Sequence, residues 1–217
     1  MSWAIITPTV GNVLHNVKSW ATVPVIEGGI NPHDRSRGYL AAKALADTDA
    51  ELFLWVDNDN IVQPDQARHL IQSAREHDAD IMAGVYVCRH AAANGKIALS
   101  FTPEPNPGDD PAQRIAFGQD GKVMKIVACG FGVVVTHRRI FSHPIAPEVD
   151  YTDWDERTVS GRAWFLPVVR GRSHLGEDRS FCTRLREQTR ARMFVDTRIV
   201  VEHRGYHLAD LVPAEGI

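Results

Sequence analysis

The sequence predicts an α/β fold in which a mostly parallel sheet carries helices on both faces. Short apolar segments alternate with Ala- and Leu-rich segments through the first half of the chain, as strands alternate with helices in such folds. The apolar segments lack a polar face, which is typical of parallel strands buried on both sides. A length of 217 residues with no linker and no internal repeat favours a single domain spanning residues 1–217.

The first half contains the most regular predicted elements. We expect strands at 3–7, 23–29, 52–56 and 80–87, and helices at 36–48 and 64–78. Pro64 suits the first position of its helix, because that position needs no N–H donor. After it, Ala67, Leu70, Ile71 and Ala74 recur at helical spacing and predict an apolar stripe that faces the sheet.

The second half is less regular. Four prolines in "FTPEPNPGDDPAQ" indicate a loop, and Gly130 and Gly132 interrupt an apolar strand segment. Phe181 and Leu185 lie one helical turn apart. The expected order is an excursion loop at 101–113, strand residues at 125–141, irregular chain at 146–164, a helix at 176–189 and two short strands within 193–207.

Composition narrows the class of protein. A hydrophobic share of 44% and a charged share of 24% are those of an ordinary soluble protein. The net charge of -3 excludes a general polyanion-binding surface, so any contact with nucleic acid needs a local basic patch. Cys88, Cys129 and Cys182 are far apart and match no metal-binding spacing, which favours reduced thiols. With no secretory leader and no run of about 20 apolar residues, we expect a cytoplasmic protein without a membrane anchor, in the host cytoplasm if it is phage-encoded.

An acidic pair follows the predicted strand "LFLWV". Asp57 and Asp59 are two residues apart, so in extended chain both side chains point to one face, away from Asn58. Two carboxylates there suit a divalent cation that bridges to phosphate oxygens; the alternative is a polar turn that happens to be acidic. A calcium-binding EF-hand loop is excluded, because Val62 and Arg68 stand where that loop needs Gly and Glu.

Two further polar groups have both a structural and a functional interpretation. Glu177 and Asp178 follow Gly176 at the start of a predicted helix, where carboxylates can cap the helix or act in catalysis. His203 follows a buried strand, where an imidazole is either structural or a metal ligand. His207 lies four residues later, but Arg204 and Gly205 between them do not match the His-Glu-x-x-His pattern of zinc proteases.

Taken in order, five segments resemble the GT-A-fold, family-2-like nucleotide-sugar glycosyltransferases, and the resemblance covers nearly the whole chain. The segments are "IITPT", "LFLWVDNDN", "ACGFGVVVTHRRIF", "GEDRSFCTRLRE" and "VDTRIVVEH". The resemblance implies a Rossmann-like GT-A sheet, with a nucleotide-sugar-binding half at about residues 1–90 and an acceptor and catalytic half at about 91–217. It also implies Mn²⁺ or Mg²⁺ and a nucleotide-sugar donor, most simply a UDP-sugar.

The resemblance also assigns site residues. Asp57-Asn58-Asp59 matches the family's Asp-x-Asp element, so Asp59 would bind the metal and Asp57 the metal or the ribose. Asp178 matches the general base, with Glu177 beside it, and His203 matches the late metal-binding histidine, although His207 is not excluded as the ligand. The implied donor contacts are Thr7, Pro8, Thr9, Arg35 or Arg37, Asn58, Gly130, Phe131 and Gly132. The first loop departs from the family, because it reads "TPTVGN" where a Pro-x-Tyr-Asn-like sequence is usual.

The chemistry supports a metal-dependent inverting hexosyl- or pentosyltransferase. A divalent cation neutralises the departing diphosphate, and one carboxylate takes the proton from the acceptor hydroxyl. Two alternatives remain open, namely a nucleotidyltransferase and a non-catalytic nucleotide-sugar-binding module. The first would normally carry a Gly-rich basic loop after the first strand, and this chain has only "TPTVGN".

The acceptor is the most open part of the prediction. Arginines crowd both sides of Asp178, either as solvated surface or as a rim that holds phosphates. The crowded arginines are Arg157, Arg162, Arg170, Arg172, Arg184, Arg186, Arg190 and Arg192. On the second interpretation Arg170, Arg172 and Trp164 would contact a DNA acceptor carrying a hydroxymethylated base, as in DNA modification, and that base would need to be extruded from the duplex. A cell-envelope or small-molecule glycan is the alternative acceptor. The sugar, the nucleotide and the oligomeric state stay open.

Overall fold

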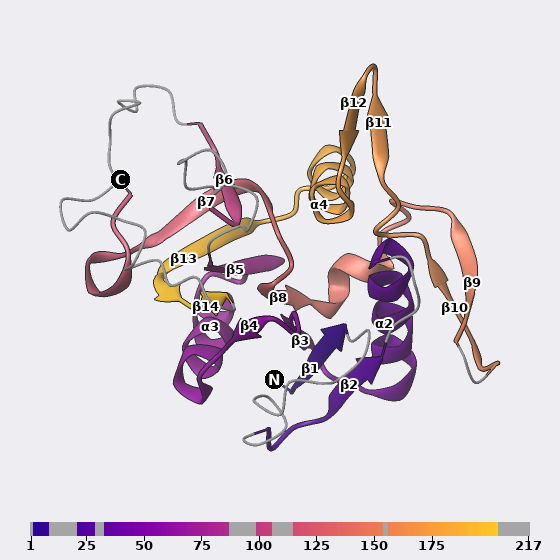
Figure 1. Cartoon of the computed structure of the whole chain (residues 1–217), viewed down its shortest axis with the longest axis horizontal. Coiled ribbons are helices and arrows are strands. Elements are labelled where there is room, and N and C mark those ends of the chain that lie inside the picture. Colours follow the sequence, from indigo (N-terminus) through magenta and orange to yellow (C-terminus); the bar gives the residue numbers. More distant parts are fainter. Residues whose placement is uncertain are drawn as a thin grey trace.

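An eight-stranded mixed sheet forms the centre of the computed structural model (Figure 1), which describes residues 2–8, 21–28, 33–86, 99–105, 115–153 and 156–203. Across the sheet the strands follow the order β2 (Val25–Gly28), β1 (Trp3–Pro8), β3 (Leu52–Val56), β8 (Val133–His137), β5 (Ile81–Val85), β13 (Met193–Val200), β7 (Val123–Cys129) and β6 (Phe101–Pro103).

Six of these eight strands run in one direction, and only β8 and β7 run against them. Strand β8 is inserted between β3 and β5, and it is antiparallel to both. Its first residue therefore lies at the same edge of the sheet as the last residues of β3 and β5. We call this edge the reaction edge, because the predicted site residues fall there.

Three helices cover the two faces of the sheet within the described residues. They are α2 (His33–Asp47), α3 (Pro64–Glu76) and α4 (Glu177–Gln188). Helices α2 and α4 pack on one face, where Phe53 and Trp55 point, and α3 packs on the other, where Leu52 and Leu54 point. The alternation of side chains along a strand sends neighbours to opposite faces, so an all-apolar strand is needed when both faces are covered. The predicted α/β class with helices on both faces is confirmed.

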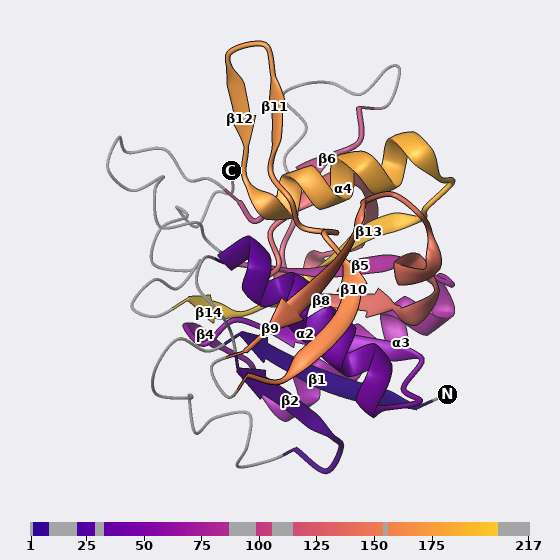
Figure 2. The same ribbon diagram turned by 90° about the vertical axis from the view of Figure 1, so that its right-hand side faces the viewer.

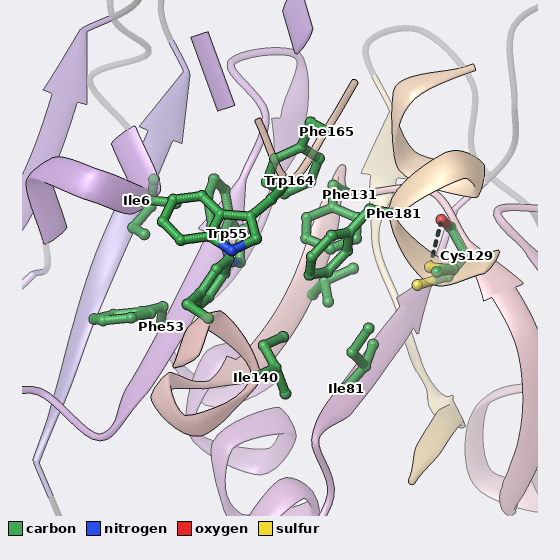
Figure 3. Close-up of a cluster of buried hydrophobic side chains, with 14 of the residues drawn as sticks. Ile6, Phe53, Trp55, Ile81, Cys129, Phe131, Ile140, Trp164, Phe165 and Phe181 are labelled. Atoms are coloured by element: carbon green, nitrogen blue, oxygen red, sulfur yellow. Dashed lines mark hydrogen bonds between the residues drawn. The ribbon is translucent and has the colours of Figure 1, made fainter. Parts of the chain in front are cut away.

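Aromatic side chains fill the core under α4 (Figure 3). Trp55 packs edge-on against Phe131, with ring centroids 5.6 Å apart, and Phe165 stacks on Phe181 at 4.7 Å. All four side chains are fully buried. Each contributes about 1.5–3 kcal/mol by leaving water. This cluster fixes the position of Phe131, whose backbone belongs to the candidate site.

Several segments differ from the sequence prediction. The stretch expected to be irregular forms a hairpin, β9 (Glu148–Thr152) and β10 (Thr158–Arg162), which lies along α2. A second hairpin, β11 (Val168–Arg170) and β12 (Ser173–Leu175), projects beyond α4 (Figure 1 and Figure 2). The sequence did not predict these hairpins, because most of their residues are at least partly exposed and so do not form an apolar segment.

The remaining differences concern short elements. Part of the predicted excursion loop adds the edge strand β6. The two strands expected after α4 are the eight-residue β13 and the short β14 (Glu202–His203), which pairs with β4 (Asn60–Ile61). Among the described residues there are also two 3₁₀ turns, at Gly118–Asp120 and Arg138–Ser142. Among the described residues, no helix is long and apolar enough to cross a membrane.

Candidate active site

Four elements bring polar groups together at the reaction edge. Asp57 follows β3, Phe131 and Gly132 precede β8, Asp178 lies in the first turn of α4, and Arg37 lies on α2. The Asp57 N–H donates to the Gly132 carbonyl over 2.9 Å, which fixes the end of β3 against the start of β8. The antiparallel insertion of β8 thus places main-chain groups beside the acidic residues.

Arg37 ties the two acidic segments to each other. Its guanidinium donates to both carboxylate oxygens of Asp57, at 3.1 and 3.0 Å, and its Nε lies 3.0 Å from Asp178 Oδ1. Glu177 is farther away, at 3.9 Å. Only 6% of the Arg37 side chain is exposed, and its guanidinium carbon lies 5.7 Å from the centre of the Phe131 ring. One buried cation therefore faces three carboxylates.

Asp178 is the most perturbed carboxylate of the site. The Phe131 N–H donates to its Oδ2 over 3.0 Å, whereas its Oδ1 is buried and accepts no hydrogen bond from the residues that the structure describes. Burial raises the pKa of Asp178 to about 7, because an ionised carboxylate loses solvation there, and Arg37 offsets part of that rise. A carboxylate with a pKa near neutral pH suits general acid–base catalysis.

A second polar group surrounds Asp59. Its Oδ2 lies 3.4 Å from His203 Nε2, and its Oδ1 accepts from Asn60 Nδ2 over 3.2 Å. The pairing of β14 with β4 sets Asn60 opposite His203, which explains how a histidine from the end of the described chain reaches this point. Asn60 is 1% exposed, and its Oδ1 has no hydrogen-bond partner within the described part of the chain.

Tyr86 braces the turn that precedes β8. Its hydroxyl accepts from the Gly132 N–H over 3.0 Å, and its ring packs edge-on against His203 with centroids 5.5 Å apart. A Cβ on Gly132 would lie 2.6 Å from Tyr86 and 2.8 Å from Asn60, and a Cβ on Gly130 would lie 2.3 Å from the Tyr86 hydroxyl. Glycine at these positions is required by the close approach of Tyr86, which the sequence did not reveal.

The predicted metal ligands are only partly assembled. Asp59 and His203 are neighbours, but Asp57 is bound by Arg37, and no three His, Cys, Asp or Glu side chains among the described residues gather closely enough to hold a metal ion. The unpartnered Asn60 Oδ1 beside Asp59 is a further hard oxygen at this point. These donors are of the kind that Mg²⁺ and Mn²⁺ prefer. The set of three predicted from the sequence stays a prediction.

The predicted donor contacts are spread along the reaction edge. Thr7 and Pro8 end β1, and Thr7 is 2% exposed with an Oγ1 that has no hydrogen-bond partner in the described segments. Asn58 lies in the turn between Asp57 and Asp59. Of the two candidate arginines, Arg35 is exposed and Arg37 is buried. Thr9 and His207 lie outside the described residues.

The predicted acceptor contacts do not form one surface. Trp164 is 2% exposed and packs edge-on against Phe141 at 5.2 Å, so its ring belongs to the core, which does not fit a contact with DNA. Arg170 donates to both Glu187 oxygens, at 2.7 and 2.6 Å. Arg172, in the turn of the β11–β12 hairpin, is exposed.

Several of the arginines on either side of Asp178 also bind groups within the protein. Arg184 donates to the carbonyls of Leu166 and Trp164. Arg162 pairs with Glu148 at 2.6 Å, and Arg192 pairs with Asp78. The ion pairs of Arg162 and Arg192 reduce the positive charge that the sequence suggested around Asp178, whereas Arg184 binds main-chain carbonyls. Linear spacing does not reveal these partners.

Three features of the site were not predicted from the sequence. They are the ion pairs of Arg37 with Asp57 and Asp178, the hydrogen bond between Tyr86 and Gly132, and the buried amide of Asn60. One signal was available for two of them. Asn60 closes the polar run after β3, and Tyr86 follows β5, so both stand at the ends of strands that share one edge.

Comparisons with known proteins support the fold and go no further. No family model matches the chain, and no curated protein sequence matches it. Among solved structures, A197 from STIV matches with a TM-score of 0.57 and 15% sequence identity, over 98% of this chain and 88% of that chain. This identity shows a shared fold alone.

Two structures of TarS 1–349 from S. aureus also match. The one in complex with UDP has a TM-score of 0.43 and 9% identity, over 93% of this chain and 60% of that chain. The other has a TM-score of 0.40 and 11% identity, over the same 93% and 60%. TM-scores this low do not establish a common fold.

Proposed function

We propose that the protein is a metal-dependent, inverting glycosyltransferase that moves a sugar from a nucleotide diphosphate to a hydroxyl acceptor. The observation that carries this proposal is the environment of Asp178. It is a mostly buried carboxylate at the reaction edge, with 18% of its side chain exposed, it is held by the Phe131 N–H, and its pKa is raised to about 7. A positioned carboxylate of this kind is what a hydroxyl nucleophile requires, because the hydroxyl must lose its proton as it attacks.

The neighbouring groups have separate roles in this proposal. Asp178 takes the proton from the acceptor hydroxyl, and Arg37 and the Phe131 N–H position Asp178. Asp59 and His203 are the residues that would hold a divalent cation. When bound, such a cation supplies positive charge for the departing diphosphate. A single base implies attack from the face opposite the leaving group and inversion at the anomeric carbon.

The proposal is tested by donor binding. Nucleotide sugars, beginning with UDP-sugars, are screened by calorimetry with and without Mn²⁺. We expect one of them to bind in a metal-dependent manner, and Asp59→Ala to abolish the metal-dependent part. A matched control is Asp65→Ala, which removes an exposed carboxylate that pairs with Arg68 three residues later in α3. Equal Mn²⁺-dependent affinity in both variants would contradict the assigned role of Asp59.

A further inference from the structure

A pocket of about 440 Å³ is lined by Asp178 but not by Arg37 or Asp57. It lies between the edge strand β6, the end of β7 and the start of α4, and its lining includes Ser100, Thr102, Gly130, Glu177, Asp178 and Arg179. In the order of the sheet, β3 lies on one side of β8, and β7 and β6 lie on the other. Asp178 therefore belongs both to the polar cluster around Arg37 and to the lining of this pocket.

The volume of the pocket limits what it can hold. Small-molecule sites typically measure about 300–1,000 Å³, so 440 Å³ suits one small molecule or the end of a larger one. A nucleic-acid duplex would have to lie outside it and insert only a single base.

The polar groups of the pocket favour a neutral ligand. Glu177 and Asp178 are hydrogen-bond acceptors, and Arg179 donates to Thr102 Oγ1 over 2.9 Å. One cation beside two carboxylates leaves no surplus positive charge. A ligand with several phosphates needs such a surplus, because phosphate binding relies on uncompensated Lys and Arg. Hydroxyl groups, which both donate and accept, match this mixture of two carboxylates, the Thr102 hydroxyl and one guanidinium.

We propose that this pocket is the acceptor site and that the acceptor is an uncharged polyhydroxy compound, such as a monosaccharide or the terminal sugar of a glycan. This inference rests on the proposed glycosyltransferase function and specifies its acceptor. It selects the glycan alternative over the hydroxymethylated base in DNA. The acceptor hydroxyl meets Asp178 from the pocket, while the donor approaches from the side of Asp57 and Asp59.

The experiment measures donor hydrolysis and sugar transfer in the same reactions. A panel of neutral methyl glycosides is compared with a duplex that contains hydroxymethylcytosine, using the nucleotide sugar identified by calorimetry. We expect transfer to at least one glycoside and none to the duplex. Thr102→Val and Arg179→Met should each raise the KM for that glycoside by about tenfold or more, as loss of one hydrogen bond or a charged contact does. Arg68→Met, an exposed arginine of α3, is the matched control.

The outcomes separate the two proposals. Transfer to the duplex and not to the glycosides would overturn the acceptor class. Transfer to a glycoside with a KM unaffected by Thr102→Val and Arg179→Met would overturn the pocket as its site. Donor hydrolysis without transfer to any glycoside would overturn this inference alone. Absence of both donor binding and donor hydrolysis would overturn the glycosyltransferase proposal and this inference with it.

Discussion

Two clusters of arginine and acidic residues lie at opposite edges of the same sheet. The one at the reaction edge joins Arg37 to Asp57, Asp178 and Glu177. The other, which we call the Asp78 cluster, consists of Asp78, Asp80, Arg139 and Arg192 and lies where β5 and β13 begin. The residue types are the same, but the environments are not.

In the Asp78 cluster the charges are balanced and the hydrogen bonds are complete. Arg139 donates to Asp80 at 2.5 Å and to Asp78 at 2.7 Å, and Arg192 also pairs with Asp78. Hydrogen bonds from Arg192 and Arg139 lower the pKa of Asp78 to about 2. Two arginines match two carboxylates, and each of the four carboxylate oxygens accepts a hydrogen bond from one of these arginines.

At the reaction edge one arginine faces three carboxylates, and burial raises the pKa of Asp178 to about 7. Negative charge is in excess there, and one carboxylate can gain and lose a proton near neutral pH. The excess of carboxylates over arginines makes the reaction edge a candidate catalytic site. In the Asp78 cluster the charges are matched, and the ion pairs hold the ends of the strands together.

The largest expected difference between the clusters is in catalysis. Asp178→Asn keeps the shape of the side chain but cannot take a proton, so transfer should fall by about 10² to 10⁴. Asp78→Asn makes the same chemical change in the Asp78 cluster, and it should leave the transfer rate close to that of the wild type. Both variants are measured for transfer and for donor affinity by calorimetry. Near wild-type transfer by Asp178→Asn would mean that the base lies elsewhere.

The next difference is in stability. Arg37→Met leaves Asp57 and Asp178 without their buried cation, and removing one partner of a buried ion pair typically costs about 3–5 kcal/mol. Arg192→Met removes an arginine whose side chain is 47% exposed, so water replaces much of the lost interaction and the cost should be much smaller. Urea unfolding at pH 8 gives both values. Equal costs would show that burial of Arg37 does not strengthen its ion pairs.

The smallest difference is in the dependence of stability on pH. Asp178 has a pKa of about 7 in the folded protein and an ordinary value of 3.8, so between these pH values the folded state binds more protons. Its contribution to stability is therefore largest below the lower value and is lost as pH rises to about 7, by at most about 1.4 kcal/mol per pH unit. Asp78 acts in the opposite sense, because its pKa is lowered from 3.8 to about 2, and its contribution is lost as pH falls through that range.

Urea unfolding between pH 4.5 and pH 7.5 tests the Asp178 part of this difference. In the wild type the free energy of unfolding should decline across the range, and in Asp178→Asn the decline should be shallower. The Asp78→Asn variant is the control, because Asp78 does not titrate between these pH values. Parallel curves for the wild type and Asp178→Asn would contradict a raised pKa of Asp178 in the folded protein.

The apolar elements were predictable from the sequence, because a strand that is buried on both faces needs an apolar side chain at every position. Strand β3 and helix α3 lie where their apolar patterns placed them. The hairpin β9–β10 was not predicted, since it packs on α2 with one side only and its partly exposed residues read as loop.

The site shows the same limit at the level of single side chains. Spacing places Asp57 and Asp59 at one strand end, and the structure keeps them there. Their partners come from α2 and β14, so Asp57 binds Arg37 and Asp59 lies beside His203. Such pairings depend on how helices and strands that are far apart in the sequence pack together. Residue spacing therefore cannot predict them. The roles of these residues in catalysis and metal binding stay predictions.

The hydrogen bond from the main-chain N–H of Phe131 to Asp178 affects which substitutions this protein can accept during evolution. The N–H of Phe131 is present whatever side chain occupies that position, so no substitution other than proline can remove it. The constraint passes instead to Gly130 and Gly132, where any side chain would collide with Tyr86. Related proteins can therefore differ in most of the surrounding sequence and still orient an acid at the start of α4. The condition is that Gly130, Gly132 and Tyr86 change together.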